Sequence, residues 1–232
     1  MIKDVKILAL IPARGGSKGI KDKNIYDLCG KPLISYTIEA ALGSQYIDDA
    51  IVTTNSQKIA DVALKYGASV PFLRPDELAQ DTSPSIEALM HAIDTLHNAG
   101  RDFDVVVWLQ PTSPLRTSED IDAAIEEFFR MGRQPLTSVS PVSDHPLLIR
   151  KMDEDGRLIK MLDISSTCRR QDMPPYYRVD GAIYIYNAAE LSLNTSLNDA
   201  CVPYVMQKNH TVDIDELSDI YLTKYYLETE LN

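Results

Sequence analysis

Continuous apolar runs alternate with amphipathic stretches over the first 140 residues of the chain. Runs such as "DAIVTT" and "DVVVWL" show no polar alternation, which predicts strands buried on both faces. Between them, apolar residues recur at the spacing of one helix face. The expected elements, in chain order, are a strand at 5–11, a helix from Pro32, a strand at 49–54, a helix at 59–66, a strand at 69–73, a helix at 84–98, a strand at 104–109 and a helix at 118–131. This order predicts an α/β fold with a doubly wound, mainly parallel sheet.

The pattern changes after about residue 137. Short apolar runs in 135–162 predict strands, with a turn at Asp155-Gly156. A polar stretch without periodicity follows, and then "AIYIY" and "PYVMQ" predict two more strands before a closing helix at 215–230. We interpret residues 1–232 as a single domain that carries an inserted arm at about 143–179. Arms of this kind often pair with a second subunit, so we expect a homodimer.

Composition excludes several classes of partner. The formal net charge of −11 and the pI near 4.8 argue against nucleic-acid binding, which needs a basic face. The longest apolar runs are too short to cross a bilayer, and no signal peptide is expected before the first strand. Three widely spaced cysteines, Cys29, Cys168 and Cys201, suit a reducing compartment. We therefore expect a cytoplasmic protein without a membrane or nucleic-acid partner.

The loop "IPARGGSKGIKDKN" collects cations directly after the first predicted strand of this acidic chain. Three of its residues are glycines, which let backbone N–H groups approach a ligand closely, and four are lysine or arginine. In an open α/β sheet, ligands bind beyond the carboxyl ends of the strands, where this loop lies. It matches neither the Walker A motif nor the dinucleotide fingerprint. An anion site such as a triphosphate site is favoured, and a solvated flexible turn is the alternative.

Three other patterns carry candidate chemistry. "LQPTSPLR" follows the 104–109 strand and holds hydrogen-bonding side chains on a stiff, proline-rich loop, although Thr117 or Ser118 after it also suits a helix N-cap. Arg74 in "FLRPDEL" could bind a ligand or pair with Asp76 or Glu77. "VDIDELSD" places two carboxylates two residues apart, which suits a hard cation such as Mg²⁺ or, for the second, the N-cap of the last helix.

The ordered motifs resemble those of the CMP-sialic acid synthetase family, the acylneuraminate cytidylyltransferases. The resemblance runs from "IPARGGSKGIKDKN" through "VPFLRPDELAQDTSPS", "LQPTSPLR" and "RRQDMPPYYRVDGAIYI" to "VDIDELSD", and so spans nearly the whole chain. It implies a Rossmann-like nucleotidyltransferase fold and a reaction that joins CTP to a 2-keto sugar acid, with release of pyrophosphate. It also implies Mg²⁺ as the cofactor.

The resemblance assigns roles to individual positions. The implied catalytic residues are Arg14, Lys18, Lys23, Asp213 and Asp215, of which Asp213 and Asp215 bind the metal. The implied nucleotide-binding residues are Ala13, Arg14, Gly15, Gly16, Ser17, Lys23, Asn24, Arg74, Ser85, Gln110, Pro111, Thr112 and Ser113. The implied sugar-binding residues are Gln110, Arg170, Tyr177 and Asp180.

The chain departs from the family pattern at two positions on the acceptor side. Leu148 replaces a family lysine near the sugar, and Asp180 replaces the usual asparagine before glycine. Because the nucleotide-side motifs are kept, we expect an altered sugar: a nine-carbon relative of sialic acid such as legionaminic or pseudaminic acid. Two alternatives stay open, a CMP-Kdo synthetase and a homologue that binds nucleotide without turnover.

Overall fold

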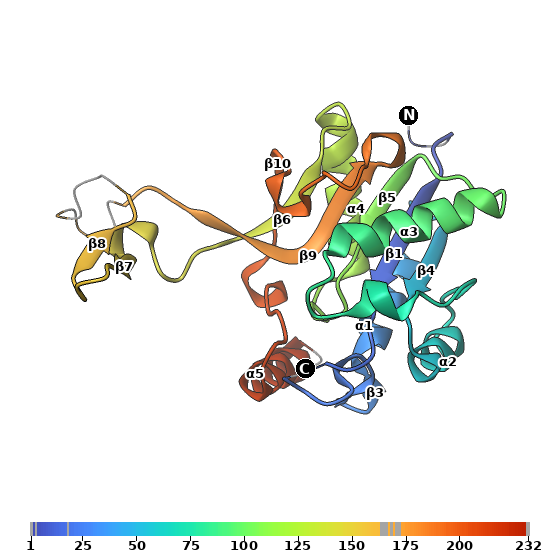
Figure 1. Ribbon diagram of the computed structural model, residues 1–232, viewed down its shortest axis with the longest axis horizontal. Coiled ribbons are helices and arrows are strands. Elements are labelled where there is room, and N and C mark those ends of the chain that lie inside the picture. The colour runs from blue at the N-terminus through green and yellow to red at the C-terminus, as the bar shows by residue number, and fades with distance from the viewer. Residues whose placement is uncertain are drawn as a thin grey trace.

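A six-stranded sheet forms the centre of the protein (Figure 1). The computed structural model describes residues 2, 4–17, 19–162, 167, 169 and 173–230. The strand order is β10-β6-β9-β5-β1-β4. These strands span Ile7–Pro12 (β1), Asp49–Thr53 (β4), Val105–Trp108 (β5), Leu136–Pro141 (β6), Tyr177–Asn187 (β9) and Val202–Val205 (β10). Neighbours pair in parallel except around β9, which runs antiparallel to both β5 and β6. The expected mainly parallel α/β sheet is confirmed.

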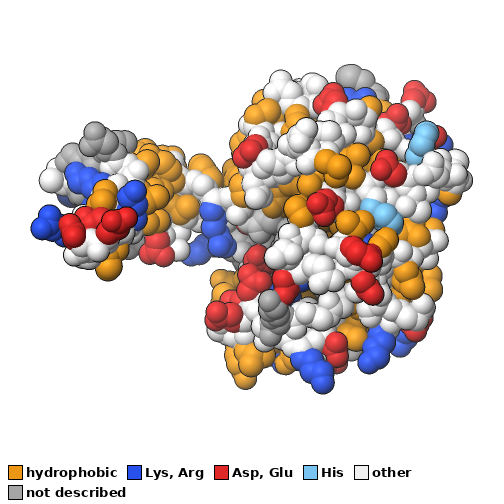
Figure 2. Space-filling model, in the orientation of Figure 1, with side chains coloured by type: hydrophobic (Ala, Val, Ile, Leu, Met, Phe, Trp, Pro, Cys, Tyr) orange, Lys and Arg blue, Asp and Glu red, His pale blue; other side chains and the backbone are white. Residues whose placement is uncertain are grey.

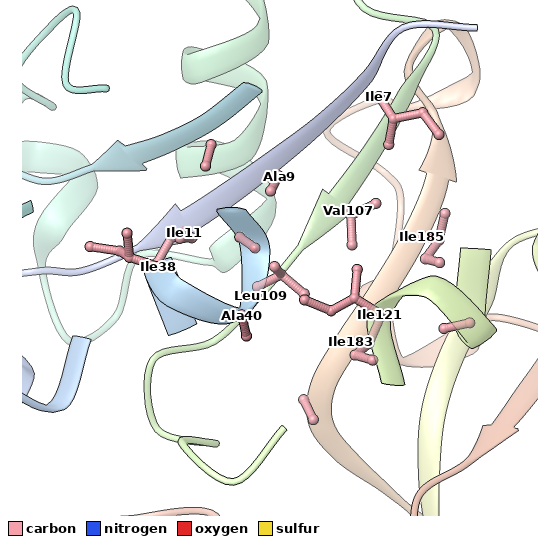
Figure 3. Close-up of a cluster of buried hydrophobic side chains, with 14 of the residues drawn as sticks. Ile7, Ala9, Ile11, Ile38, Ala40, Val107, Leu109, Ile121, Ile183 and Ile185 are labelled. Atoms are coloured by element: carbon pink, nitrogen blue, oxygen red, sulfur yellow. The ribbon is translucent and has the colours of Figure 1, made fainter. Parts of the chain in front are cut away.

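Helices cover both faces of the sheet because successive strand residues point to opposite sides. Ile7, Ala9 and Ile11 of β1 belong to a buried cluster on one face, which Figure 3 shows, whereas Leu8 and Leu10 belong to a second cluster on the other face. The helices span Leu33–Gly43 (α1), Gln57–Lys65 (α2), Ser85–Asn98 (α3), Ser118–Arg130 (α4) and Leu217–Glu230 (α5). Buried residues of α1, α2 and α4 join the first cluster, and those of α3 join the second.

The direction of the strands decides where the site forms. β1, β5 and β6 are parallel, so the loops that follow them leave the sheet at one edge. β9 runs antiparallel to β5 and β6, so its first residues lie at the carboxyl ends of those strands. Residues far apart in the sequence, such as Arg14, Gln110 and Asp180, are thereby brought to one side of the molecule.

An arm projects from the sheet between β6 and β9 (Figure 1). Near its tip, β7 (Arg150–Met152) and β8 (Leu158–Lys160) pair antiparallel as a separate two-stranded sheet. The turn between them contains Gly156 with φ of 77°, so the Asp155-Gly156 turn signal is confirmed. A further small hairpin, β2 (Asp27–Leu28) and β3 (Lys31–Pro32), precedes α1.

One expected strand is wrong. In place of a strand at 69–73, only Ser69 forms an isolated bridge with Ile51. Pro71 has no N–H to donate to a ladder, and Leu73 is largely exposed, so the segment leaves the sheet after one residue. In the described part of the chain, no helix has the length and apolar character needed to cross a bilayer.

The start of α4 illustrates how local sequence sets an element boundary. Thr117 is the N-cap, its side chain accepts a hydrogen bond from the backbone N–H of Asp120, and the Asp120 carboxylate accepts from the backbone N–H of Thr117. This reciprocal arrangement is a capping box, and it satisfies two donors that the first turn leaves open. Thr117 rather than Ser118 is therefore the cap that the sequence predicted at this boundary.

Candidate functional site

The first cavity lies beyond the carboxyl end of β1. Its volume is about 430 Å³. The lining residues are Pro12, Arg14, Ser17, Gly19, Lys23, Asn24, Arg74, Leu78, Gln80, Asp81, Ser83, Pro84, Ser85, Ala88, Trp108, Gln110, Pro111, Thr112 and Asp215. They come from the loops after β1 and β5, the start of α3 and the segment before α5, so elements distant in sequence build one pocket.

The glycine-rich loop is held in place by neighbouring segments. The N–H of Gly15 donates to Asn55 Oδ1 at 2.9 Å, and Asn24 Nδ2 donates to the carbonyl of Arg14 at 3.0 Å. A Cβ on Gly19 would lie 2.7 Å from the carbonyl oxygen of Asp215, closer than side chains approach. Glycine at position 19 is therefore required for the loop to pack against the segment before α5. These contacts pack the described part of the loop against Asn55 and the segment before α5.

Two cations of the loop line the first cavity. Lys23 Nζ donates to the carbonyl of Ile214 at 2.8 Å and lies 3.1 Å from Asp215 Oδ1, with only 16% of its side chain exposed. Arg14 NH1 lies 2.6 Å from Asp81 Oδ1. Both acidic partners line the same cavity, so each cation can exchange a carboxylate contact for a contact with an anionic ligand.

Arg74 adds an unsatisfied donor to the wall of this cavity. The residue is buried, and its Nε has no hydrogen-bond partner. Burial, together with the nearby charge of Arg14, lowers the pKa of Arg74 to about 10, so it stays charged at neutral pH. The expected alternative, a pair with Asp76 or Glu77, does not form among the described residues; Asp76 instead accepts from Asn55 at 2.9 Å. A buried guanidinium with a free donor suits a ligand that presents acceptors.

A second cavity adjoins the first and has a volume of about 660 Å³. The two share Pro84, Ser85 and Gln110 as lining residues. The remaining lining residues of the second cavity are Ile86, Arg178, Val179, Asp180, Gly181, Tyr184, Thr195, Ser196, Leu197, Asn198 and Asp213. Two ligands bound in these cavities would meet at the loop that carries Gln110.

Asp180, near the start of β9, is one of two aspartates that line the second cavity as described. It is 6% exposed; Oδ1 accepts hydrogen bonds from the Ser138 hydroxyl and from the N–H of Ala182, whereas the buried Oδ2 has no partner. Burial raises the pKa of Asp180, and the hydrogen bonds from Ser138 and Ala182 counter that effect only in part. A buried carboxyl with one open oxygen is a recognition group for a polar atom of a ligand.

Asp213 and Asp215 enter the site from one extended segment. Ile214 between them is fully buried, and its N–H donates to the carbonyl of Thr112 at 2.8 Å. Asp213 lines the second cavity and Asp215 the first, so this one segment contributes a carboxylate to each cavity. Asp213 Oδ1 is buried without a hydrogen-bond partner, and burial raises the pKa of this carboxyl.

Arg116 connects the loop that carries Gln110 to strand β9. It was not among the residues expected in the site. Its side chain is fully buried, and NH1 donates to the carbonyl of Gln110 at 3.2 Å and to the carbonyl of Ala182 at 2.8 Å. Burial lowers its pKa to about 10. The available signal was its place as the last residue of "LQPTSPLR", but arginine at the end of a loop gives no hint of burial.

Several expected site residues lie outside the cavity walls. Among the described residues, the linings do not include Ala13, Gly15, Gly16, Ser113 or Tyr177. Ala13 and Ser113 are buried, and Tyr177 is half exposed at the base of the arm. Lys18 and Arg170 fall outside the residues that the structure describes. Arg178, eight residues after Arg170, is the arginine that lines the second cavity.

Comparison with known proteins places the chain in a family. The cytidylyltransferase family model matches residues 8–221. The CMP-N,N'-diacetyllegionaminic acid synthase of Legionella pneumophila is 39% identical over 229 residues, which are 97% of each chain. The pseudaminic acid cytidylyltransferase of Campylobacter jejuni is 33% identical and covers 95% of each chain. The N-acylneuraminate cytidylyltransferase of Escherichia coli is 36% identical over 94% of this chain and 51% of its own length.

Solved structures support the fold. A CMP:2-keto-3-deoxy-manno-octonic acid synthetase complexed with CTP aligns with a TM-score of 0.72 over 97% of this chain and 99% of its own, at 16% identity. A 4-diphosphocytidyl-2C-methyl-D-erythritol synthase aligns with a TM-score of 0.67 over 96% and 98%, at 14% identity. From the matched family model and the relatives that align along almost their full length, the chain belongs to the cytidylyltransferases, in the acylneuraminate branch that its motifs resemble.

Proposed function

We propose that this enzyme transfers the cytidylyl group of CTP to a nine-carbon 2-keto sugar acid and releases pyrophosphate. The observation that carries the proposal is the pair of adjoining cavities, one lined by Arg14, Lys23 and Arg74 and the other by Asp180, with Gln110 shared between them. The names of the relatives, which are synthases and cytidylyltransferases for sugar acids of this class, support the same reaction.

The first cavity suits the nucleotide. Arg14 and Lys23 are placed to neutralise the triphosphate, while the free Nε of Arg74 offers a donor to an acceptor of the base or ribose. The anomeric hydroxyl of the sugar attacks the α-phosphorus and loses its proton to the surrounding water, a new P–O bond forms, and the bond to pyrophosphate breaks. Charge grows on the departing pyrophosphate, and fixed cations lower the barrier by stabilising it. The contribution of this chain is therefore positioning and charge neutralisation.

We propose that Asp213 and Asp215 hold Mg²⁺ at the junction of the cavities. The open, buried Oδ1 of Asp213 fits a cation ligand, because a buried carboxylate oxygen without a partner is costly otherwise. Mg²⁺ is commonly held by one or two carboxylates and completes its shell with substrate phosphate oxygens and water. When bound, the ion supplies positive charge beside the reacting phosphate.

The acceptor side favours a relative of sialic acid over N-acetylneuraminic acid itself. Asp180 lines the second cavity and has a buried carboxyl oxygen without a hydrogen-bond partner, where the family pattern has an amide. Leu148, in the place of a family lysine, is 53% exposed on the arm and offers no charge. Legionaminic and pseudaminic acids are the preferred acceptors.

The activity belongs in a reducing cytoplasm, where CTP is made and exposed thiols such as Cys29 and Cys201 stay free.

A substrate panel tests the reaction and the acceptor together. With CTP and Mg²⁺, pyrophosphate release gives kcat/KM for N,N'-diacetyllegionaminic, pseudaminic and N-acetylneuraminic acids and for Kdo. We expect one of the first two to exceed N-acetylneuraminic acid about tenfold or more, which is about 1.4 kcal/mol in transition-state binding. Asp180→Asn should narrow that ratio, because the amide restores a donor where the carboxylate accepts.

The panel also distinguishes the alternatives. A tenfold preference for N-acetylneuraminic acid contradicts the acceptor assignment, and a preference for Kdo favours a CMP-Kdo synthetase. Absence of turnover with every acid, combined with stabilisation by CTP but not NAD, points to a non-catalytic homologue. At about 100 times its Kd, CTP adds about 2.7 kcal/mol to the free energy of unfolding, so a thermal melt detects it.

Lys23→Ala should lower kcat about 10²–10³-fold, the loss typical of removing one donor to developing negative charge. Lys21→Ala is the matched control: it lies in the same loop, is exposed and lies outside the described lining of the first cavity. Steady-state kinetics with saturating CTP and acceptor measure both variants. Equal losses in the two would mean that general loop charge, rather than the placement of Lys23, matters.

Asp213→Asn should abolish most Mg²⁺-dependent turnover, since the amide keeps the size but removes the charge that a hard cation prefers. Glu216→Gln is the control, because it changes a neighbouring exposed acid. Rates measured over a Mg²⁺ titration separate the two. Wild-type activity of Asp213→Asn at limiting Mg²⁺ contradicts the metal assignment.

We propose that two copies associate through the arm. Figure 2 shows hydrophobic side chains gathered on it, and the structure leaves Leu148, Ile149, Met152, Leu158, Ile159, Met161, Tyr177 and Val179 exposed there. A two-stranded hairpin is marginally stable alone in water, so the β7–β8 sheet needs a partner surface. A second copy supplies the same apolar arm and buries both.

Sedimentation equilibrium at micromolar concentration should give twice the chain mass of 25.9 kDa. The double variant Met152→Asp with Leu158→Asp should raise the dimer dissociation constant about 10²-fold or more, because it places charge on the apolar hairpin. Leu64→Asp, on the exposed face of α2 in the body, should leave it unchanged. A monomeric wild type at this concentration contradicts the proposal.

A further inference from the structure

Asp120 is a buried carboxylate that neither cavity uses. It lies in the first turn of α4, is 2% exposed and lines neither cavity. Oδ2 accepts from the N–H of Thr117 at 3.0 Å and lies 2.7 Å from Nδ1 of His210, while Oδ1 accepts from the Tyr204 hydroxyl at 3.1 Å. Donors from α4, β10 and the 3-10 turn Lys208–His210 (η7) thus converge on one anion.

The charge of Asp120 is kept despite its burial. Burial alone raises the pKa of the carboxyl, but hydrogen bonds from His210, Thr117 and Tyr204 outweigh it and leave the pKa below its usual value. An ionised, buried carboxylate forms strong hydrogen bonds. Removing one donor leaves its charge incompletely paired inside the protein, which is costly. The contact with His210 is therefore a firm anchor rather than an incidental contact.

His210 stands three residues before Asp213. After it, the Thr211 hydroxyl donates to the Lys208 carbonyl at 2.9 Å, and Val212 is buried in a third hydrophobic cluster. Ile214 is fastened next: its N–H donates to the Thr112 carbonyl at 2.8 Å, and its carbonyl accepts from Lys23 Nζ at 2.8 Å. Asp213 thus lies between an anchor on α4 and an anchor on the glycine-rich and "LQPTSPLR" loops. Loss of the first anchor removes the hydrogen bond that fastens this segment to Asp120 of α4, while the contacts of Val212 and Ile214 with the third buried cluster persist.

We propose that Asp120 and His210 are a pair of positioning residues that set the place of Asp213 between the two cavities. The proposal rests on the metal role assigned to Asp213 above. α4 begins two residues after Arg116, which holds the carbonyl of Gln110, so the pair also fixes the Asp213 segment relative to the loop that both substrates share. Groups that hydrogen-bond to a metal ligand commonly change metal affinity 10–100-fold when they are lost, and this pair acts on Asp213 through the backbone of residues 210–213.

The test measures Mg²⁺ dependence of CTP binding by calorimetry, without acceptor and without turnover. His210→Phe keeps the size but removes the hydrogen bond, and it should raise the half-saturating Mg²⁺ concentration about tenfold or more. His210→Gln keeps a donor and should stay within about threefold of the wild type. The matched control is His97→Phe, because His97 Nδ1 pairs with Asp102 Oδ1 at 2.6 Å on the exposed surface.

Each outcome decides between a positioning role and a structural one. If His210→Phe lowers the melting temperature but leaves the Mg²⁺ dependence unchanged, the proposal is overturned. If the variant does not fold, Tyr204→Phe carries the test: it removes one hydrogen bond from Asp120 and should raise the half-saturating concentration roughly two- to fivefold, and no change overturns the proposal. Asp213→Asn serves as the reference. If Asp213→Asn leaves the half-saturating Mg²⁺ concentration unchanged, the metal role of Asp213 is refuted. If Asp213→Asn raises it but His210→Phe does not, only the positioning role of the pair is refuted.

Discussion

A buried guanidinium holds the site together. Arg116 donates from one nitrogen to the carbonyls of Gln110 and Ala182, and so joins the loop after β5 to the buried part of strand β9. Taking this charge out of water is costly, and the opposite charges of Asp120 and Asp180 offset part of that cost. Because Gln110 lies on the wall that both cavities share, the Arg116 side chain fixes one segment that contributes to both cavities.

The sheet makes this arrangement possible. Parallel strands deliver the loops after β1 and β5 to one edge, and the reversed β9 starts its buried course at that edge with Asp180 and Gly181. Gly181 has φ of 82°, and a Cβ there would lie 3.0 Å from Gln110 Oε1. Glycine at position 181 therefore lets β9 approach the loop that carries Gln110 closely. Arg116 can then donate to carbonyls of both segments. The loops after two parallel strands, β1 and β5, line the first cavity, whereas the reversed strand β9 supplies Arg178, Val179, Asp180 and Gly181 to the second.

The sequence predicted the features that depend on neighbouring residues, namely most strands and helices and one turn. Uninterrupted apolar runs gave β1, β4 and β5, helical spacing gave α3 and α4, and Asp155-Gly156 gave the turn of the arm. The strand expected at 69–73 failed because apolar composition alone does not provide a partner: Ser69 meets Ile51, and Pro71 then ends the pairing. Arg74 and the two carboxylates around Ile214 were expected in the site from their motifs. Arg116 and the Asp120–His210 contact were not, since the latter joins residues 90 positions apart and no local pattern encodes such a pair.

The contacts of the glycine-rich loop have a consequence for how the enzyme is made. Lys23 bonds to Ile214 and Asp215 across 191 and 192 positions of the chain, and Gly19 packs against the backbone of Asp215. During synthesis, the first strands and their loop leave the ribosome long before the segment that completes the pocket. Until the 214–215 segment has been synthesised, the cationic loop lacks these partners, and the first cavity lacks the part of its wall that Asp215 supplies.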